Sequence, residues 1–290
     1  MYILQGFSKF FTAKSNFDNM EALSVEKQDA HIHSPFCPHG TQDSFEQYIE
    51  HAIKQGFSSI TFAEHAPLPK GFSDPTPFKD SAMMKEDVEA YIIEINRLKE
   101  QYKQQITIKT GFEIDYISGF EEETESFLNQ YGPYLDDSIL SVHFLKCKDR
   151  WLCIDYSPET FSEAIRLTGS INHVYELYFD QVLQSIMAEL GPFKPQRIGH
   201  ITLAAKFKKK YPPTRSFSAS IMEILKEIKK KGYELDLNTA GLRKPLCREI
   251  YPDPDILAVA KEMGIPLIYG SDAHQAKEQG ADFDLIQKYI

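Results

Sequence analysis

The feature that most constrains the fold is a regular alternation between short β-rich runs and longer segments with helical spacing. The β-rich runs are residues 29–34, 58–63, 106–112, 138–145, 197–201, 233–238 and 265–270. The helical segments that follow them are residues 43–55, 84–104, 120–130, 158–190, 216–231, 254–263 and 282–289. Strands separated by helices run parallel, because a helical crossover returns the chain to the same end of the sheet. The sequence therefore predicts an α/β fold built on a parallel sheet.

The length and composition favour one α/β domain. The chain has 290 residues, 42% hydrophobic and 26% charged, which is ordinary for a globular protein. Because no Pro/Ser-rich linker divides the chain, residues 28–290 are predicted to form a single domain, and residues 1–27 an N-terminal extension. The extension lacks a secretory cleavage pattern, and its Asp18 and Glu21 disfavour a transit-like segment. No apolar run approaches the roughly 18 residues that a transmembrane helix needs.

The charge balance and the cysteines exclude several other classes. There are 32 basic and 42 acidic side chains, for a net charge of −10, which disfavours a nucleic-acid partner. The 4 cysteines form no C-x-x-C pair, so neither a zinc ribbon nor a disulfide scaffold is expected. They predict a cytoplasmic protein in a reducing compartment. The basic run at residues 206–210 is predicted to be a solvated loop, or alternatively a rim that attracts anions.

Histidines and acidic residues gather where the predicted strands end. His31 and His33 are two positions apart, so on a strand both side chains point to the same face. Asp272 and His274 repeat this spacing after the last predicted strand. Since the carboxyl ends of the strands converge in a parallel barrel, these side chains are expected to share one pocket. The complete set is His31, His33, His39, His65, Glu113, His143, His200, Asp272 and His274.

A metal centre explains this set better than a hydrogen-bonded core does. A single histidine near a strand end is usually a packed core residue, but so many neutral imidazoles together would leave nitrogen atoms unsatisfied. Divalent cations would bind those nitrogens, and the number of ligands suits two or three ions that keep a position open for substrate. Imidazole and carboxylate ligands without thiolate favour Zn, Mn or Fe. The other two histidines, His51 and His173, fall within helical segments and are predicted to pack there or lie at the surface.

These residues, in this order, resemble the metal-ligand set of the PHP (polymerase and histidinol phosphatase) superfamily. The segments that resemble its histidinol-phosphatase branch are DAHIHSPFCPHGT, TFAEHAPLP, GFEIDYI, LSVHFL, RIGHITL and LDLNTAGLRKP. The resemblance implies a distorted (β/α)7 barrel with a trinuclear metal site at the C-terminal ends of its strands. It also implies a phosphatase that hydrolyses L-histidinol phosphate, a reaction of histidine biosynthesis. Residues 1–27 lie outside the family pattern.

The resemblance further implies how the metal ligands divide and react. The three groups would be His31, His33, Glu113 and Asp272 for the first ion, Glu113 with His143 and His200 for the second, and His39, His65 and His274 for the third. Metal ions lower the pKa of bound water, so a metal-bridging hydroxide would attack phosphorus. Asp272 or His274 would protonate the leaving alkoxide.

Four further residues are predicted to contact the substrate. Arg197 lies three residues before His200, and Arg243 follows Asn238 in the segment NTAGLR. Both arginines offer the forked donors that bind phosphate. Arg243 could instead pair with an acidic residue of the run at 233–238. Glu64 and Asp115 neighbour the ligand set and could bind the substrate amine. Both could equally hold metal-bound histidines in position.

Two other functions remain open from the residues alone. Another PHP-type phosphoesterase, acting on a small phosphate ester or a nucleotide, would use the same metal site. The net charge and the absence of an interleaved aromatic and basic stripe disfavour a nucleic-acid substrate. A metal-storage or scaffold protein is the non-enzymatic alternative, but structural metal sites are usually closed and often rich in cysteine.

Overall fold

The central element is a parallel sheet of seven strands in the order β1-β2-β3-β4-β7-β8-β9. The computed structural model describes residues 26–290, so most of the predicted extension 1–27 lies outside the described residues. The strands are β1 (Gln28–Ile32), β2 (Ser59–His65), β3 (Thr107–Asp115), β4 (Ile139–Ser141), β7 (Arg197–Ile198), β8 (Glu234–Asn238) and β9 (Leu267–Gly270). Each corresponds to one of the predicted β-rich runs, and every neighbouring pair is parallel.

The sheet curls until its first and last strands meet. The amide of Asp272 donates a hydrogen bond to the carbonyl of His31 (2.7 Å), and the amide of His33 donates to the carbonyl of Ala273 (2.9 Å). Nearby, the buried carboxylate of Asp29 accepts from the amide of Ser271 (2.9 Å). We call these contacts between β1 and the segment that follows β9 the seam. The result is a nearly closed (β/α)7 barrel, as predicted.

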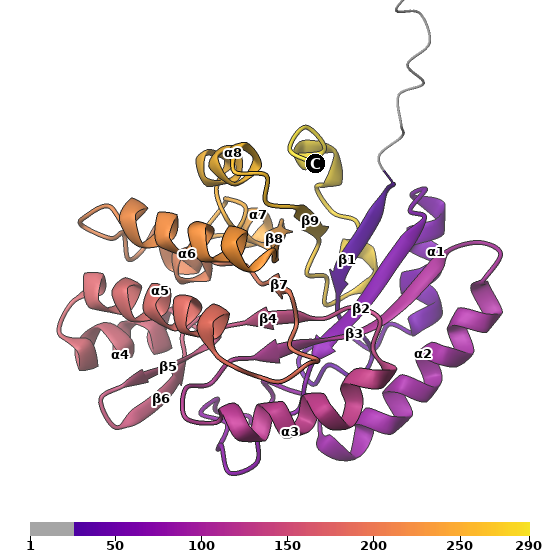
Figure 1. The fold of residues 1–290 in the computed structure, drawn as a ribbon, viewed down its shortest axis with the longest axis horizontal. Coiled ribbons are helices and arrows are strands. Elements are labelled where there is room, and N and C mark those ends of the chain that lie inside the picture. The colour runs from indigo at the N-terminus through magenta and orange to yellow at the C-terminus, as the bar shows by residue number, and fades with distance from the viewer. Residues whose placement is uncertain (1–25) are drawn as a thin grey trace, which may run out of the picture.

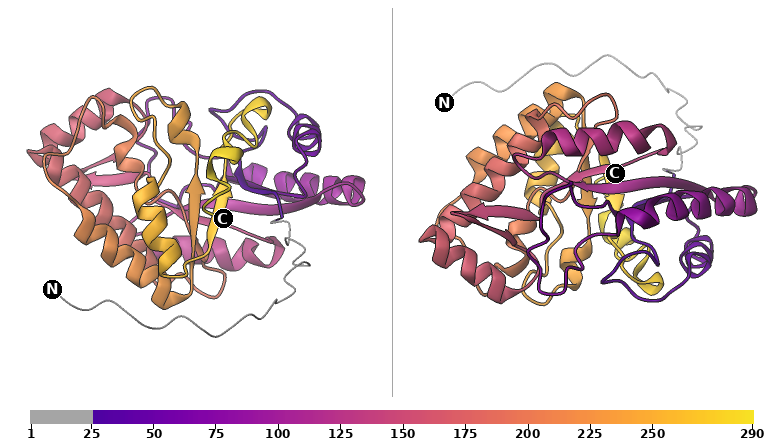
Figure 2. Two further views of the ribbon diagram at one scale, coloured as in Figure 1. Left: turned by 90° about the horizontal axis from the view of Figure 1, so that it is seen from above. Right: turned by 90° about the horizontal axis from the view of Figure 1, so that it is seen from below.

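Helices surround the strands (Figures 1 and 2). They are α1 (Phe45–Lys54), α2 (Val88–Tyr102), α3 (Glu121–Tyr131), α4 (Pro158–Thr168), α5 (Ile171–Met187), α6 (Ser218–Lys231), α7 (Ala240–Arg243), α8 (Pro254–Glu262) and α9 (Phe283–Ile286). Short 3₁₀ helices are η1 (Lys85–Asp87), η2 (Gly132–Tyr134), η3 (Leu203–Phe207) and η4 (Ala276–Glu278). Among residues 26–290, none of these helices is both long and apolar enough to cross a membrane.

Helix α1 illustrates how the local sequence specifies an outer helix. Ser44 accepts a hydrogen bond from the amide of Gln47, whose side chain accepts one from the amide of Ser44, so a capping box fixes the start. Phe45, Tyr48 and Ile49 are buried at positions i, i+3 and i+4, which places one apolar stripe against the sheet.

The strand predicted at 197–201 and the helix predicted at 282–289 are shorter in the structure, as β7 and α9, and two other predicted elements are divided. The predicted helix 158–190 is two helices, because Gly169 ends α4 with a φ of 86°, a left-handed conformation that glycine adopts without steric cost. The predicted strand 138–145 stops at Ser141, and an antiparallel hairpin follows, formed by β5 (Phe144–Cys147) and β6 (Arg150–Cys153). Within this hairpin region, Phe144 and Cys153 belong to a small apolar cluster separate from the main core.

Candidate metal centre

The structure brings all nine predicted residues into one cluster at the C-terminal ends of the strands. The His33 ring centroid lies 4.3 Å from that of His65 and 3.9 Å from that of His274. On the other side of His65, the His143 ring centroid is 5.6 Å away, and it lies 4.9 Å from that of His200. The spacing of histidines at successive strand ends therefore places them together. His51 and His173 do not line this site.

Glu113, at the carboxyl end of β3, lies at the centre of the cluster. Its Oε1 is 2.9 Å from Nε2 of His200, and its Oε2 is 3.1 Å from Nδ1 of His65 and 3.4 Å from Nε2 of His31. The side chain is 1% exposed. Burial alone would raise the pKa of Glu113, but the surrounding histidines lower it well below its usual value. A carboxylate that stays ionised here can bridge two cations.

Asp272 reaches the cluster from an unusual backbone conformation. Its φ is 52°, a left-handed value that costs a non-glycine residue about 1–3 kcal/mol. Its Oδ1 lies 3.1 Å from Nε2 of His33 and 3.6 Å from Nδ1 of His274, while its Oδ2 accepts a hydrogen bond from Nδ2 of Asn238 (3.2 Å). The seam holds the backbone in this conformation, since the Asp272 amide donates to the carbonyl of His31.

Carboxylates behind the cluster orient three of its histidines. In each pair the Nδ1–H donates to the carboxylate, which directs Nε2 toward the centre. The pairs are His31 with Asp236 (3.0 Å), His33 with Glu64 (3.3 Å) and His143 with Asp115 (2.8 Å). The carbonyl of Asp80 does the same for His39, at 2.7 Å. This arrangement is the one expected around metal-binding imidazoles.

Space for His31 depends on a glycine in the last strand. A Cβ atom on Gly270 would lie 2.4 Å from Cβ of His31 and 2.8 Å from Oδ1 of Asp236. Both distances are too short for non-bonded atoms. Gly270 therefore allows His31 and the carboxylate that orients it to fit beside β9.

The unpaired nitrogen atoms show that the cluster fits divalent cations. Nε2 of His31, Nδ1 of His65 and Nδ1 of His200 are buried without a hydrogen-bond partner among residues 26–290, at a cost of about 1–3 kcal/mol each. Lone pairs that face carboxylate oxygens repel them unless a proton or a cation lies between. Burial alone would lower the pKa of His33, but Asp272 and Glu64 raise it to about 9. A divalent ion would remove this repulsion more effectively than protons.

Three groups of ligand atoms are close enough to share an ion. In each group all of the atoms lie within 4.8 Å of one another. The groups are His31, His33 and Asp272; then Glu113, His143 and His200; then His33, Cys37, His65 and His274. The second group is the predicted one, and the first lacks only Glu113 of its predicted members. The third differs from the prediction, since it contains His33 and Cys37 and does not contain His39. The site thus supports binding of divalent metal.

Two residues that contact the cluster, Cys37 and Asp236, were not predicted from the sequence. Cys37 follows the H-x-H strand in the loop, and its position beside His65 and His274 depends on a turn that periodicity does not reveal. Burial raises the pKa of its thiol, so it stays neutral without a metal. Asp236 had a usable signal: it lies two residues before Asn238 on β8, so the two polar side chains share one face of a buried strand.

Neither predicted arginine lines the cavity of about 410 Å³ beside the cluster. Arg197 is 1% exposed, and its Nη2 donates to the carbonyl of Ala30 (2.9 Å) and to Oδ2 of Asp137 (2.9 Å). The reason is its place on the strand. Arg197 begins β7, whereas His200 follows its carboxyl end, and three residues of extended chain span roughly 10 Å.

Arg243 instead ties α7 to the C-terminal segment. Its Nη1 lies 3.1 Å from Oδ2 of Asp282, its Nη2 donates to the carbonyl of Ser271 and its Nε is 3.6 Å from Glu278. It therefore pairs with acidic residues, as the alternative interpretation held, but with different ones from those in the run at 233–238.

The predicted amine-binding carboxylates have different positions. Glu64 is fully buried and accepts hydrogen bonds from the amides of Ser34 (2.8 Å) and His65 (2.9 Å). It does not line the cavity, whereas Asp115 does. Since Glu64 contacts His33 and Asp115 contacts His143, the geometry favours the second interpretation, in which both orient histidines.

Comparison with known proteins agrees with this architecture. A family model for the PHP domain matches residues 29–240. The chain belongs to the PHP domain family. Among individual relatives, it is 52% identical over 262 residues to the histidinol-phosphatase of Bacillus subtilis, a match that covers 90% of this chain and 98% of that protein.

Two solved structures share the fold. A candidate histidinol phosphatase from Listeria monocytogenes is 39% identical, with a TM-score of 0.86, over 89% of this chain and 99% of that one. The histidinol phosphate phosphatase of Lactococcus lactis, solved with zinc, L-histidinol and phosphate, is 24% identical, with a TM-score of 0.65, over 92% of this chain and 94% of that one.

Proposed function

We propose that this chain is a metal-dependent phosphatase that hydrolyses L-histidinol phosphate to L-histidinol and phosphate, a reaction of histidine biosynthesis. The observation that carries the proposal is the cluster of His, Glu and Asp side chains at the carboxyl ends of the barrel strands. The 52% identity to a histidinol-phosphatase along almost its whole length supports the substrate. We further propose that residues 28–290 form one catalytic domain. All 4 cysteines are unpaired and buried, which supports a reducing, cytoplasmic location.

We propose that the nine residues hold two to three divalent ions, Zn, Mn or Fe. The division of ligand atoms into three groups supports this number. Such ions lower the pKa of a bound water and neutralise charge on phosphoryl oxygens. Imidazole and carboxylate donors suit these metals, and the Lactococcus lactis structure, which shares the fold, contains zinc.

The chain's own residues orient the imidazole rings that would bind the ions, and they supply a proton to the leaving group. Asp236, Glu64 and Asp115 fix the rings that face the centre, which excludes unproductive imidazole orientations. Asp272 and His274 both line the cavity, and we propose that one of them delivers a proton to the leaving alkoxide oxygen. The cavity beside the cluster receives the remainder of the phosphate ester.

The direct test compares substrates with and without metal. The purified protein is expected to release phosphate from L-histidinol phosphate, to lose this activity after chelation and to regain it when Mn or Zn is added. A dinucleotide serves as the comparison substrate and should give no measurable product. Hydrolysis of the dinucleotide alone would favour another PHP-type phosphoesterase, and bound metal without any hydrolysis would favour a storage protein.

Loss of the carboxylate behind His31 should weaken metal binding. In Asp236→Asn the charge that holds the Nδ1–H is removed, and loss of such a supporting residue typically costs about 10- to 100-fold in metal affinity. Competition with a chromophoric chelator measures this affinity directly. Asp284→Asn, at an exposed position on α9, is the matched control and should bind metal normally. Equal affinities in the two variants would contradict the orienting role of Asp236.

A further inference from the structure

Two lysines, rather than arginines, supply positive charge to the cavity wall. Lys206 lies on η3 and Lys244 directly follows α7, and both line the cavity together with Asp272 and His274. Lys206 belongs to the basic run that was predicted to be a solvated loop. Its place in the cavity wall instead agrees with the alternative interpretation, a rim that attracts anions.

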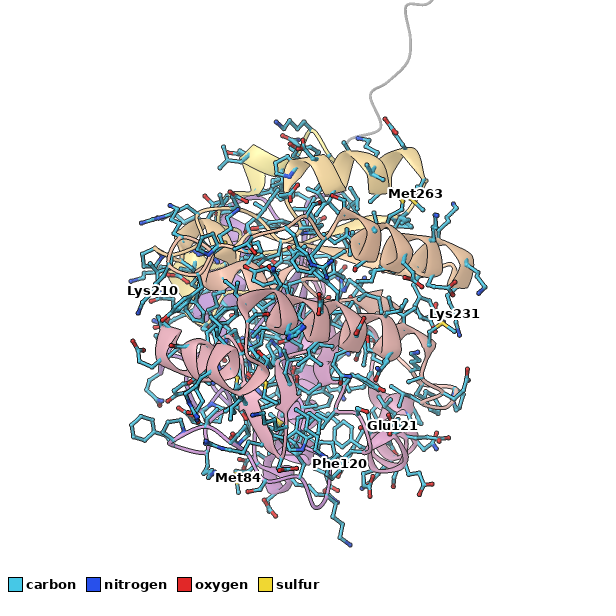
Figure 3. The ribbon with its side chains drawn as sticks, turned by 90° about the vertical axis from the view of Figure 1, so that its left-hand side faces the viewer. Met84, Phe120, Glu121, Lys210, Lys231 and Met263 are labelled. Carbon is cyan, nitrogen blue, oxygen red and sulfur yellow. The ribbon has the colours of Figure 1, made fainter. Side chains whose placement is uncertain are left out.

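The other cations of the basic run behave differently. Lys208 pairs with Glu249, and Lys210 lies 3.7 Å from Glu159 at the molecular surface (Figure 3). Lys209 is exposed and does not line the cavity. Of the lysines in this run, therefore, only Lys206 lines the cavity.

Lys206 is fixed at the wall by an acidic partner. Its Nζ lies 2.8 Å from Oδ2 of Asp155, and the two side chains are only 20% and 16% exposed. Burial alone would raise the pKa of Asp155, but Lys206 and His143 lower it well below its usual range, so the pair stays charged at neutral pH. One of the three ammonium donors is used in this contact, which leaves others for a ligand.

Lys244 has no such partner. Among residues 26–290 its ammonium group forms neither a hydrogen bond nor an ion pair, and burial together with the nearby charge of Lys206 lowers its pKa. Two ammonium groups that face one cavity repel each other, although the carboxylates of Asp155 and Asp272 offset part of that repulsion. An anion in the cavity would relieve that repulsion.

We propose that Lys206 and Lys244 bind the phosphoryl oxygens of the substrate that do not face the metal ions. This inference rests on the proposed phosphatase function and assigns to two lysines the role that the sequence suggested for Arg197 and Arg243. The ligand class is a phosphate monoester dianion, and its inorganic product would bind at the same place. Lysine binds phosphate as a point charge, without the paired geometry of arginine.

Binding of inorganic phosphate to the metal-loaded protein tests the role of Lys244. Calorimetric titration should show Lys244→Met binding phosphate about 10- to 100-fold more weakly, the loss expected for one hydrogen bond to a charged group. Lys244→Arg should recover much of the affinity, and the metal content should be unchanged in both. Lys209→Met, from the same basic run but outside the cavity, should bind phosphate like the unaltered protein.

Lys206 needs a paired substitution because Lys206→Met alone leaves Asp155 buried without its partner, which destabilises a fold. The double variant Lys206→Met/Asp155→Asn avoids that charge and should also bind phosphate more weakly. Unchanged phosphate affinity in Lys244→Met and in the double variant, at full metal content, would overturn the proposal. These titrations need no turnover, so failure to hydrolyse L-histidinol phosphate would reject the proposed function separately.

Discussion

Replacing His33 by alanine is expected to abolish hydrolysis of L-histidinol phosphate while the barrel stays folded. His33 belongs to two of the three groups of potential ligand atoms, and its Nε2 lies 3.1 Å from Asp272 and 3.7 Å from Glu113. Its loss would therefore disturb two of the proposed metal sites at once. We expect a fall in kcat/KM of more than about 100-fold, beyond what loss of a supporting residue typically costs.

Steady-state kinetics with added Mn or Zn, together with metal analysis and circular dichroism, measures this effect. The matched control is His173→Ala, which removes an exposed imidazole of α5 outside the cluster and should leave kcat/KM unchanged. Asp272→Asn should be nearly as inactive, and asparagine tolerates the left-handed backbone at this position. Near-normal turnover by metal-replete His33→Ala would remove His33 from the reacting centre.

Replacing Arg197 by alanine is expected to reduce stability rather than substrate binding. The guanidinium is buried and pairs with Asp137, and removal of one partner from a buried ion pair typically costs about 3–5 kcal/mol. The carbonyl of Ala30 also loses its donor. Because Arg197 lies outside the cavity, kcat/KM per folded molecule should stay close to that of the unaltered protein.

Urea denaturation measures the loss of stability, and kinetics at a temperature where the variant is folded measures the activity. Arg166→Ala, which removes an arginine that is 68% exposed, should change the free energy of unfolding by no more than about 0.5 kcal/mol. The double variant Arg197→Met/Asp137→Asn should regain part of the lost stability. A large fall in kcat/KM at equal folded fraction would restore Arg197 to the substrate site.

The barrel and the nine clustered residues could be predicted because both follow from local patterns. Each strand–helix unit has its own periodicity, and the position of a residue after a strand fixes which end of the barrel it occupies. His65 is the last residue of β2, and Glu113 lies near the carboxyl end of β3. Such positions depend only on the few residues between the side chain and the end of its own strand.

Positions that depend on tertiary structure were less predictable. Arg197 stands only three residues before His200, but the extended strand carries the two side chains to different levels of the barrel. Lys206 has the composition of a surface loop, and only the packing of η3 beside Asp155 places it in the cavity. Lys244 enters the same cavity because of a short helix, α7, that periodicity does not reveal.

The seam joins two segments that the ribosome adds at very different times. His33 and Asp272 are 239 residues apart in the chain but adjacent in the metal centre. A nascent chain thus carries its H-x-H pair long before the ribosome has added the residues that complete the site. Contacts across so long a separation form late in folding because closing the intervening loop costs entropy. The completed centre therefore exists only after the segment that follows β9 has closed the barrel, and metal that prefers this state stabilises closed barrels over partly synthesised ones.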